Sequence, residues 1–280
     1  MATDEFEHKY GPWAVVVGAS DGVGAEFARA IAMGGVNVVL LARRRAMLEE
    51  LASSIHAESD VETRIIALDL TAPNATDEII NATRDIEVGS IVYCAGADPS
   101  YSRFLEQPAS NALAMVQRNC VVPILLCHHF AAPMQTRGRG GIVLVSSGAA
   151  LVGAKNMVAY SASKAFDMVM AEALWAELHS AGVDVLGLVL GATDTPALRQ
   201  LLFKRGQLQT IDAPIPGAAT AHDVVAGALE NLPNGPTHFA TQELREGSKQ
   251  LGAMSRSDAA RVMLSMAGAL ICPDDDEVRP

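Results

Sequence analysis

The feature that most constrains this chain is a regular alternation of short apolar runs with longer helix-forming segments. Most of the runs are apolar throughout, which is typical of parallel strands that are covered on both faces. The predicted strands are 13–18, 37–42, 63–68, 89–94, 141–146, 183–190 and the less apolar 236–240. The predicted helices are about 23–34, 45–58, 74–86, 109–136, 158–181 and 221–231. Strand–helix–strand units of this length predict an α/β fold with a doubly wound parallel sheet.

The 280 residues suit one large α/β domain, and no Pro/Ser-rich linker divides them, so we expect a single domain over 1–280. Segment 191–218 interrupts the alternation after the sixth strand. Ligands of open α/β sheets bind outside the carboxyl ends of the strands, so this segment is expected to be a substrate lid. An ordinary loop with a short helix is the alternative. Segment 241–267 has helix-forming composition and is expected to dock on the lid or on a neighbouring subunit, before a solvated acidic end at 273–280.

Charge and cysteine usage narrow the function classes. The formal net charge is -11 and the pI is near 5.0, which argues against general affinity for nucleic acid or anionic membranes. The acidic N-terminus lacks the apolar stretch of a signal peptide, and the apolar strand-like runs are much shorter than the ~20 residues of a membrane helix. The cysteines show no C-x-x-C spacing, so neither a metal site nor a disulfide framework is expected. A cytoplasmic protein fits these features.

The first predicted strand runs directly into the sequence GASDGVG, and a helix follows. Glycines allow close backbone approach, and the unpaired N–H groups of a helix N-terminus can bind a pyrophosphate. The G-x-x-x-G-x-G spacing differs from the commoner G-x-G-x-x-G fingerprint, and a tight turn without a ligand is the alternative. The strand-before, helix-after context predicts nucleotide binding. The expected contacts are Gly18, Ser20, Asp21, Gly22, Val23 and Gly24.

The end of the second strand indicates which dinucleotide binds. An NAD site usually carries an Asp or Glu there, which accepts hydrogen bonds from the ribose 2′-hydroxyl. Here Ala42 is followed by Arg43, Arg44 and Arg45. Cations are unfavourable beside the positive end of a helix dipole, so this triplet is better explained by an anion than as a solvated helix start. Because a guanidinium can grip a 2′-phosphate, we predict NADP(H) rather than NAD(H), bound by Arg43 with help from Arg44.

A possible acid/base pair lies at Tyr160 and Lys164 in YSASK. Residues four apart share a helix face, and a nearby ammonium favours phenolate, lowering the pKa of a tyrosine from ~10. Such a tyrosine could act as a general acid/base near neutral pH. The same spacing is common on solvated helix faces, so the pair alone does not indicate catalysis.

A further residue, Ser147, ends the fifth strand at the edge where a sheet binds its ligand. Together with GASDGVG and Tyr160-x-x-x-Lys164, it gives residues 12–240 a close resemblance to the short-chain dehydrogenase/reductase family. The resemblance implies a Rossmann fold. It also implies that Tyr160 exchanges a proton with the substrate oxygen, and that Lys164 holds the nicotinamide ribose and lowers the pKa of Tyr160. Ser147, rather than Ser146, matches the family's substrate-binding serine.

Two other polar residues match family positions. Asn119 matches the helix asparagine that supports a proton relay to the lysine, although alone it would be read as a capping or solvated residue. Asp69, followed by Leu70, resembles the family's adenine-contacting Asp, although a turn-starting Asp is the alternative from the residue itself.

The sequence departs from the family pattern at two places. The family's Asn-Asn-Ala-Gly after the fourth strand is Tyr93-Cys94-Ala95-Gly96, and a thiol cannot replace the amide's hydrogen bonds. The usual Pro-Gly after the sixth strand is Leu190-Gly191, which is expected to loosen that turn. Neither change removes a catalytic group. The cofactor contacts that the resemblance still implies here are Ala95, Gly96, Gly191, Thr193 and Thr195.

The substrate is expected to be a small molecule with a carbonyl or secondary alcohol. Apolar residues of the lid and of neighbouring loops could line a pocket for a bulky ketone, or they could be the packed face of a short helix. They are Leu198, Leu201, Leu202 and Phe203 in the lid, Leu151, Val152 and Met157 after the fifth strand, and Tyr101 and Phe104 after the fourth.

A homodimer or homotetramer is also expected, because 109–136 and 158–181 are the usual interface helices of the family. The second helix offers small residues for close approach, at Ala159, Ala162, Ala165, Ala171 and Ala173. The alternative is that these apolar faces pack within one monomer.

The leading hypothesis is an NADP(H)-dependent oxidoreductase that moves a hydride between the nicotinamide and a carbonyl/alcohol pair. A nucleotide-binding regulator without turnover is one alternative, but it would need only the glycines and arginines. An epimerase or dehydratase on the same scaffold is another, although such enzymes in related families usually carry a sizeable extra substrate domain.

Overall fold

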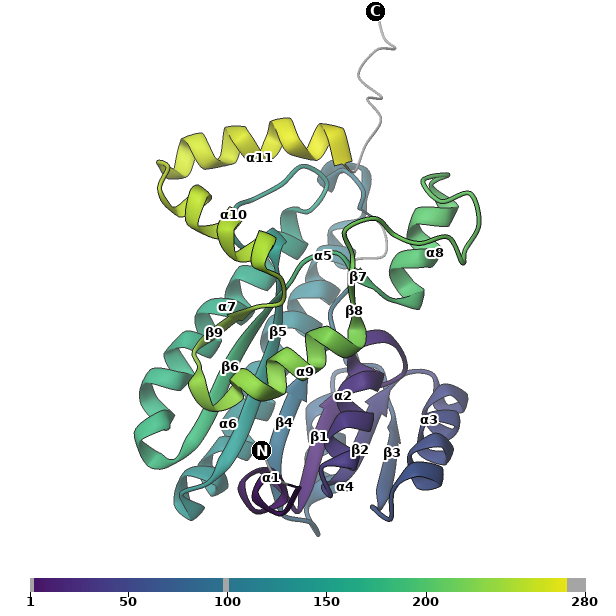
Figure 1. Ribbon diagram of the computed structural model, residues 1–280, viewed down its shortest axis with the longest axis vertical. Helices are drawn as coiled ribbons and strands as arrows, with labels where there is room; N and C mark the ends of the chain where they lie inside the picture. The colour runs from purple at the N-terminus through teal and green to yellow at the C-terminus, as the bar shows by residue number, and fades with distance from the viewer. Residues whose placement is uncertain (1–2, 98–100, 271–280) are drawn as a thin grey trace, which may run out of the picture.

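A computed structural model describes residues 3–97 and 101–270, and its centre is a parallel sheet (Figure 1). Among the described residues the sheet has seven strands in the order β3-β2-β1-β4-β5-β6-β9. The strands are β1 (Trp13–Val17), β2 (Asn37–Ala42), β3 (Thr63–Ala67), β4 (Val88–Tyr93), β5 (Gly140–Ser147), β6 (Val183–Leu190) and β9 (Thr237–Phe239). The order reverses direction between β1 and β4, which places a ligand crevice at the carboxyl ends of these strands. The predicted doubly wound parallel sheet is confirmed.

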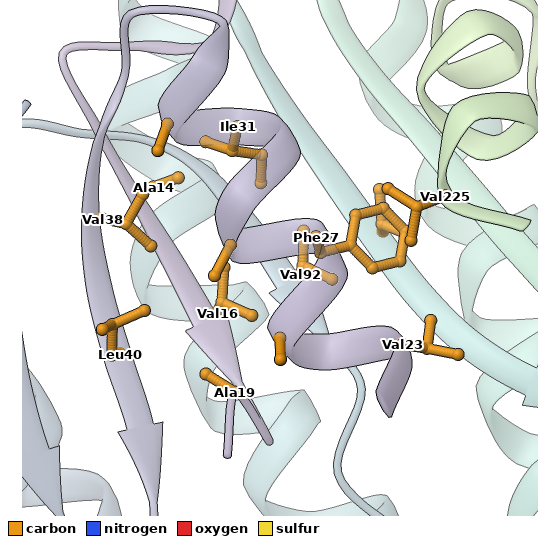
Figure 2. Packing of buried hydrophobic residues seen from close by; sticks show 14 of the residues in the cluster. Ala14, Val16, Ala19, Val23, Phe27, Ile31, Val38, Leu40, Val92 and Val225 are labelled. Carbon is orange, nitrogen blue, oxygen red and sulfur yellow. The ribbon is translucent and has the colours of Figure 1, made fainter. Parts of the chain in front are cut away.

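Helices cover both faces of the sheet, as the apolar strands require. One layer contains α2 (Gly22–Met33), α3 (Arg45–Glu58) and α9 (Ala221–Asn231). The other contains α4 (Ala75–Thr83), α6 (Val122–Arg137) and α7 (Val158–Leu178). Figure 2 shows the first layer, where Phe27 of α2 lies among Val16, Val92 and Val225. This packing fixes α2, and therefore its N-terminus, against the end of β1.

The predicted helix 109–136 is interrupted. It consists of α5 (Ala109–Val116), a π-helical turn at Gln117–Val121 and then α6. The π turn contains the fully buried Asn119. Over the described residues, Ala109–Arg137 is the one helical stretch that is long and apolar enough to cross a membrane, a criterion that core helices also meet. Here α6 packs against β4 and β5.

The excursion after β6 has its own small framework. Strand β7 (Thr193–Asp194) pairs in parallel with β8 (Ala219–Thr220), so the ends of the excursion are tied together. Between them lies α8 (Pro196–Lys204), which contains no buried residue. The excursion is thus neither a plain loop nor a segment packed into the core.

The chain after β9 forms α10 (Gln242–Gly252) and α11 (Arg256–Leu270), as the helix-forming composition predicted. In Figure 1, α8 and the pair α10–α11 lie on opposite sides of the same end of the sheet. Arg256 donates a hydrogen bond to the Leu151 carbonyl at 2.7 Å, so the extension contacts the loop after β5. The predicted acidic end at 273–280 lies outside the described residues.

One element escaped the sequence analysis, the N-terminal helix α1 (Thr3–Tyr10). Its last residue, Tyr10, is buried, and the hydroxyl donates a 2.7 Å hydrogen bond to Asp184 of β6. The polar composition of α1 hid the helix, although Phe6 and Tyr10 both pack against the core.

Candidate active site

The predicted phosphate-binding turn has space only for glycine at its centre. A Cβ at Gly24 would lie 2.1 Å from the Gly18 carbonyl oxygen, so α2 begins in direct contact with the end of β1. Gly18 has φ +94° and Gly22 has φ +56°, a region that glycine enters without steric cost. A Cβ at Gly22 would meet the Thr195 side chain at 2.9 Å. The turn therefore adjoins the segment after β6 and leaves the N-terminus of α2 open to an anion.

The floor of the crevice continues after β4. A Cβ at Gly18 would lie 2.8 Å from the Ala95 amide nitrogen, and one at Gly96 would lie 2.7 Å from the Asn119 side-chain oxygen. Gly96 has φ +129°, again in the region that favours glycine. The glycine turn, the Ala95-Gly96 segment and the π turn that carries Asn119 thus pack directly against one another at the carboxyl ends of β1 and β4.

The two arginines that directly follow β2, Arg43 and Arg44, have different neighbours. Arg44 donates a 2.8 Å hydrogen bond to the Ser20 hydroxyl and forms an ion pair with Asp21, so it is joined to the glycine turn. Asp69 accepts hydrogen bonds from the Thr71 backbone amide at 2.9 Å and the Thr71 hydroxyl at 2.8 Å. The amide bond is the largest cause that lowers the pKa of Asp69, and the charge of Arg43 acts in the same direction. The charge of Arg118 acts in the same direction, so Arg43 and Arg118 both stabilise the Asp69 carboxylate.

Two of the remaining predicted cofactor residues, Val23 and Leu70, have buried side chains that pack in the core. Val23 lies within the first layer of the core, and Leu70 lies in the second.

The structure distinguishes the two serines that end β5. Ser146 is buried, and its hydroxyl donates a 2.7 Å hydrogen bond to the Lys164 carbonyl, so it holds α7 against the sheet. Ser147 is only partly buried and caps a short 3₁₀ turn at Gly148–Ala150, accepting from the Ala149 amide at 3.2 Å. Helix α7 packs along β5 and this turn. Ser147 is therefore the more accessible of the two serines.

Tyr160 and Lys164 both lie in the first two turns of α7, but their environments differ. Tyr160 is partly exposed, whereas Lys164 is buried. The Lys164 ammonium donates to the Val145 carbonyl at 2.8 Å and to Asp167 at 2.9 Å. Burial disfavours the ammonium, but the charges of Asp167 and Tyr160 outweigh it, so the pKa of Lys164 lies above its ordinary value. Lysine is therefore charged and fixed beside the tyrosine.

Asn119 does not behave as a solvated or capping residue. Its side-chain amide donates to the Ser163 hydroxyl at 2.9 Å and to the Gly96 carbonyl at 3.3 Å. The Ser163 hydroxyl in turn donates to the Tyr160 carbonyl at 2.9 Å. Asn119 thus joins the cofactor floor to the first turn of α7, and it fixes the helix that presents the tyrosine.

The segment after β6 closes the crevice opposite Asn119. The Thr193 side chain is buried and donates to the Gly191 carbonyl at 3.3 Å. The Thr195 hydroxyl accepts from the Leu198 amide at 3.2 Å and so caps α8. Leu244 of α10 packs beside Gly191, within 3.8 Å of where a Cβ would lie. The turn at Leu190-Gly191, which was expected to be loose, is thus covered by a side chain of the C-terminal extension.

The predicted substrate-pocket residues separate into two groups. Val152 and Met157 are buried, whereas Phe203 and Phe104 are exposed by 47% and 48%. Tyr101 lies near the catalytic helix, with its ring centroid 6.4 Å from that of Tyr160. The remaining predicted members, Leu151, Leu198, Leu201 and Leu202, are partly buried. The Tyr101 ring therefore provides an apolar surface beside Tyr160. The predicted pocket residues of α8 remain partly or largely exposed.

Several residues near the site carried no family signal. Arg205, after α8, stacks over the Tyr101 ring at 5.0 Å, and the Tyr93 hydroxyl donates to the Arg118 carbonyl of the π turn. Tyr93 thereby supplies a brace beside Cys94, whose thiol has a pKa raised by burial to about 11. Asp167 could have been found from its i,i+3 spacing to Lys164. The others depend on loop geometry that the sequence does not determine.

Two observations delimit the site. In the part of the chain that the structure describes, no group of three or more His, Cys, Asp or Glu residues is placed to hold a metal ion. A surface hollow of about 480 Å³ lies between α9, β9 and α10, and none of the residues discussed as catalytic lines it. The chemistry is therefore expected at the carboxyl ends of β1, β4, β5 and β6.

Comparisons with known proteins agree with this geometry. A family model described as short chain dehydrogenase matches residues 12–205. The 7beta-hydroxysteroid dehydrogenase of Clostridium sardiniense is 32% identical over 255 residues, which cover 90% of this chain and 94% of the relative.

Two solved structures extend the comparison to the fold. A structure from a study of 7beta-hydroxysteroid dehydrogenase stereoselectivity has a TM-score of 0.84 at 30% identity, and the match covers 92% of this chain and 98% of the other. A short-chain dehydrogenase from Sphingobium yanoikuyae in complex with NADPH has a TM-score of 0.73 at 25% identity, covering 88% and 97%.

Proposed function

This chain belongs to the short-chain dehydrogenase family, whose members are oxidoreductases of CH–OH and C=O groups, and we propose that it interconverts a bulky hydroxysteroid-like alcohol and its ketone with NADP(H). The observation that carries the proposal is the placement of Tyr160 and the buried Lys164 on one helix that packs along the strand ending in Ser147. A protein that only binds a nucleotide has no need of this set.

The described residues fit a nicotinamide dinucleotide. Close packing at Gly18, Gly22, Gly24 and Gly96 brings the N-terminus of α2, the end of β4 and Asn119 together, while residues 20–22 of the turn remain partly exposed. When bound, the cofactor supplies or accepts the hydride. The glycine turn would hold its pyrophosphate, Asp69 its adenine, and Lys164 its nicotinamide ribose.

The chain's own residues would handle the proton. Tyr160 would donate a proton to the carbonyl oxygen in reduction and accept one from the alcohol in oxidation. Ser147 would hydrogen-bond the same oxygen and orient it. Lys164, fixed by the Val145 carbonyl, would favour the phenolate form of Tyr160.

The substrate class follows from two lines of support. Tyr101, which is partly buried, offers aromatic surface near Tyr160. Of the three matches named above, two concern 7beta-hydroxysteroid dehydrogenases, which indicates a rigid, polycyclic secondary alcohol. The acidic composition is compatible with the cytoplasmic location that we expect for such an enzyme.

The mechanism is tested by Tyr160→Phe, with NADPH consumption measured against a panel of ketones that includes 7-oxosteroids. We expect turnover to fall by at least ~10²–10⁴-fold, because general acid catalysis contributes that much. NADPH affinity, measured by fluorescence titration, should stay within a few-fold, because the cofactor contacts lie elsewhere. A variant with near-wild-type kcat would refute the role of Tyr160. A wild-type chain that binds NADPH but turns over no member of the panel would favour the regulator alternative.

Cofactor choice is tested by separate alanine substitutions at Arg43, Arg44 and Arg45. Arg44 contacts the glycine turn and the charge of Arg43 acts on Asp69, whereas Arg45 pairs with Glu49 along α3. We expect the substitutions at Arg43 and Arg44 to weaken NADPH by ~10-fold or more and NADH little, because one charge-assisted hydrogen bond contributes about 1.5–3 kcal/mol. Arg45→Ala is the matched control. Equal losses for both cofactors, or a wild-type preference for NADH, would contradict NADP(H) selectivity.

We also propose a homodimer or homotetramer. Apolar side chains on the outer face of α5, α6 and α7 remain exposed, at Leu113, Val116, Ile124, Leu125, Val158 and Val169. Ala171, one of the small residues expected at the interface, is instead buried against Gly187 of β6. The exposed alanines Ala162 and Ala173 stay available to a partner. Light scattering at micromolar concentration should show a mass above the 29.4 kDa of one chain, and an active species at that mass would refute assembly.

A further inference from the structure

The catalytic lysine has a charged partner that its proposed role does not need. Asp167 lies one turn after Lys164 in α7, with its Oδ2 atom 2.9 Å from the ammonium nitrogen. The side chains are 2% and 5% exposed, so the pair is almost completely removed from water. A buried ion pair costs desolvation energy, and a well-packed apolar pair is often equally stable. Stability alone therefore does not explain the carboxylate.

The other groups around Asp167 leave its charge to Lys164. Its Oδ1 atom is buried and has no hydrogen-bond partner among the described residues. Tyr93 of β4, Cys120 of the π turn and Cys127 of α6 are the titratable groups that face it from neighbouring elements. Burial raises the pKa of each, to about 12 for Cys127, so all three are neutral near pH 7. The positive charge of Arg118 acts on Tyr93 and opposes the rise in its pKa.

The lysine, in turn, links Asp167 to the tyrosine. Asp167, Tyr160 and Cys94 each favour the charged form of Lys164. The charge of Asp21 in turn raises the pKa of Cys94. An ammonium has three N–H donors. Two of those on Lys164 are engaged by Asp167 and the Val145 carbonyl, which leaves one for a ribose hydroxyl. The ammonium is therefore held at one place, and the neighbouring carboxylate stabilises its charge.

We propose that Asp167 is a positioning residue that anchors the Lys164 ammonium and keeps it charged in its buried place beside Tyr160. The proposal rests on the proposed roles of Tyr160 and Lys164. Burial acts to lower the pKa of Lys164 and to raise that of Asp167, and the charge of each group opposes the effect of burial on the other. Without the carboxylate, the buried lysine would lose its proton more readily and would no longer favour the phenolate.

The first test is the pH profile of Asp167→Asn, which keeps a hydrogen-bond acceptor for Lys164 but removes the charge. Oxidation requires the phenolate, so its kcat/KM rises with pH through the pKa of Tyr160. We expect the rise to move to higher pH by about one unit, because losing one charge at the distance between Asp167 and Lys164 changes a pKa by that order, and the lysine then favours the phenolate less. The variant should then oxidise a 7β-hydroxysteroid, or whichever secondary alcohol of the panel is turned over, several-fold more slowly than the wild type near neutral pH. Asp167→Ser is measured in the same way if the asparagine variant does not fold.

The matched control is Asp184→Asn. It removes a carboxylate of β6 that Tyr10 and Lys9 of α1 bind. It should leave the profile unmoved. A profile of Asp167→Asn that is lowered uniformly but not shifted would indicate a purely structural role and overturn the proposal. Activity retained by Tyr160→Phe would instead overturn the proposed mechanism, so the two failures are distinguishable.

The second test measures the pair without substrate or cofactor. Lys164→Met leaves a buried, unpaired carboxylate, and its Tm should fall by about 5–10 °C. Adding Asp167→Asn to that variant should recover at least half of the loss, because no charge is then stranded. Strictly additive losses in the double variant would show that the two side chains do not act as a pair, and would overturn the anchoring role.

Discussion

The glycine turn after β1 and the α8 excursion after β6 lie at the same end of the sheet, yet different contacts hold them. In the turn, the backbone at Gly24 adjoins the Gly18 carbonyl so closely that a Cβ would lie 2.1 Å from the oxygen. In the excursion, no side chain of α8 is buried. There Arg199 anchors the segment through Asp194, with two bonds of 2.6 Å, and through the carbonyls of Ile211 and Ala213.

This contrast separates two tasks of one crevice. The cofactor is constant from one turnover to the next, and close backbone packing can build a rigid site for it. A substrate must enter and leave, which suits a cover that is attached by a few polar contacts. Changes in the turn should therefore affect folding and cofactor affinity, whereas changes in the excursion should affect mainly substrate affinity.

The largest expected effect comes from Gly24→Ala. The added methyl group must displace the Gly18 backbone, so we expect NADPH affinity to fall by at least ~100-fold, corresponding to about 3 kcal/mol. Gly247 of α10, where a Cβ meets no atom within 4 Å, provides the control. Gly247→Ala should leave binding unchanged and stabilise the protein by about 0.5–1 kcal/mol. Equal NADPH affinities for both variants, measured by calorimetry, would show that the close packing at Gly24 is not needed for the cofactor site.

A contrast in stability alone is expected from truncating a phenylalanine in α2 and one in α8. Phe27 of α2 is fully buried in the layer shown in Figure 2, whereas Phe203 of α8 is 47% exposed. Phe27→Ala should lower the free energy of unfolding by about 3–5 kcal/mol, because it leaves a cavity. Phe203→Ala should lower it by less than about 1 kcal/mol. Urea denaturation checks both values, and a large loss for Phe203→Ala would show that α8 is part of the core.

The smallest expected effect tests the attachment of the excursion. Arg199→Ala removes the contacts to Asp194 and to two carbonyls. We expect KM for the steroid ketone to rise by about 3–10-fold, with NADPH affinity unchanged, because charge-assisted bonds of this kind contribute about 1.5–3 kcal/mol and these are partly solvated. Hydrogen exchange over 196–213 should accelerate. Unchanged exchange would show that other contacts hold the segment, and a matched loss of NADPH affinity would show that the two regions are coupled.

The same contrast explains how much the sequence could predict. The strands and helices of the sheet layers were predicted to within a few residues because burial on both faces leaves uninterrupted apolar runs. The glycine turn and the Tyr160–Lys164 pair were found because their spacing is fixed by local geometry. Asn119 was placed in a helix, but the π turn that brings its amide to Ser163 depends on packing against α7.

The substrate side could not be predicted to the same depth. Whether Phe203 is buried depends on where α8 rests, and this is set by Arg199 reaching carbonyls that have no sequence signature. Helix α1 was missed because its composition is mostly polar, although Phe6 and Tyr10 pack against the core. Asp167 was overlooked, since an acidic residue after a catalytic lysine reads as a solvated helix position until its burial is known.

The anchoring of loops through main-chain oxygens has a consequence for how this protein can change over generations. Arg199 binds the carbonyls at positions 211 and 213, and Arg256 binds the carbonyl at position 151. Every amino acid provides that acceptor, so the side chains at these positions can be exchanged without loss of the attachment. Mutation and selection can therefore try new residues around the substrate while two arginines keep the loops in place. Specificity can drift in small steps on a scaffold whose cofactor site does not change.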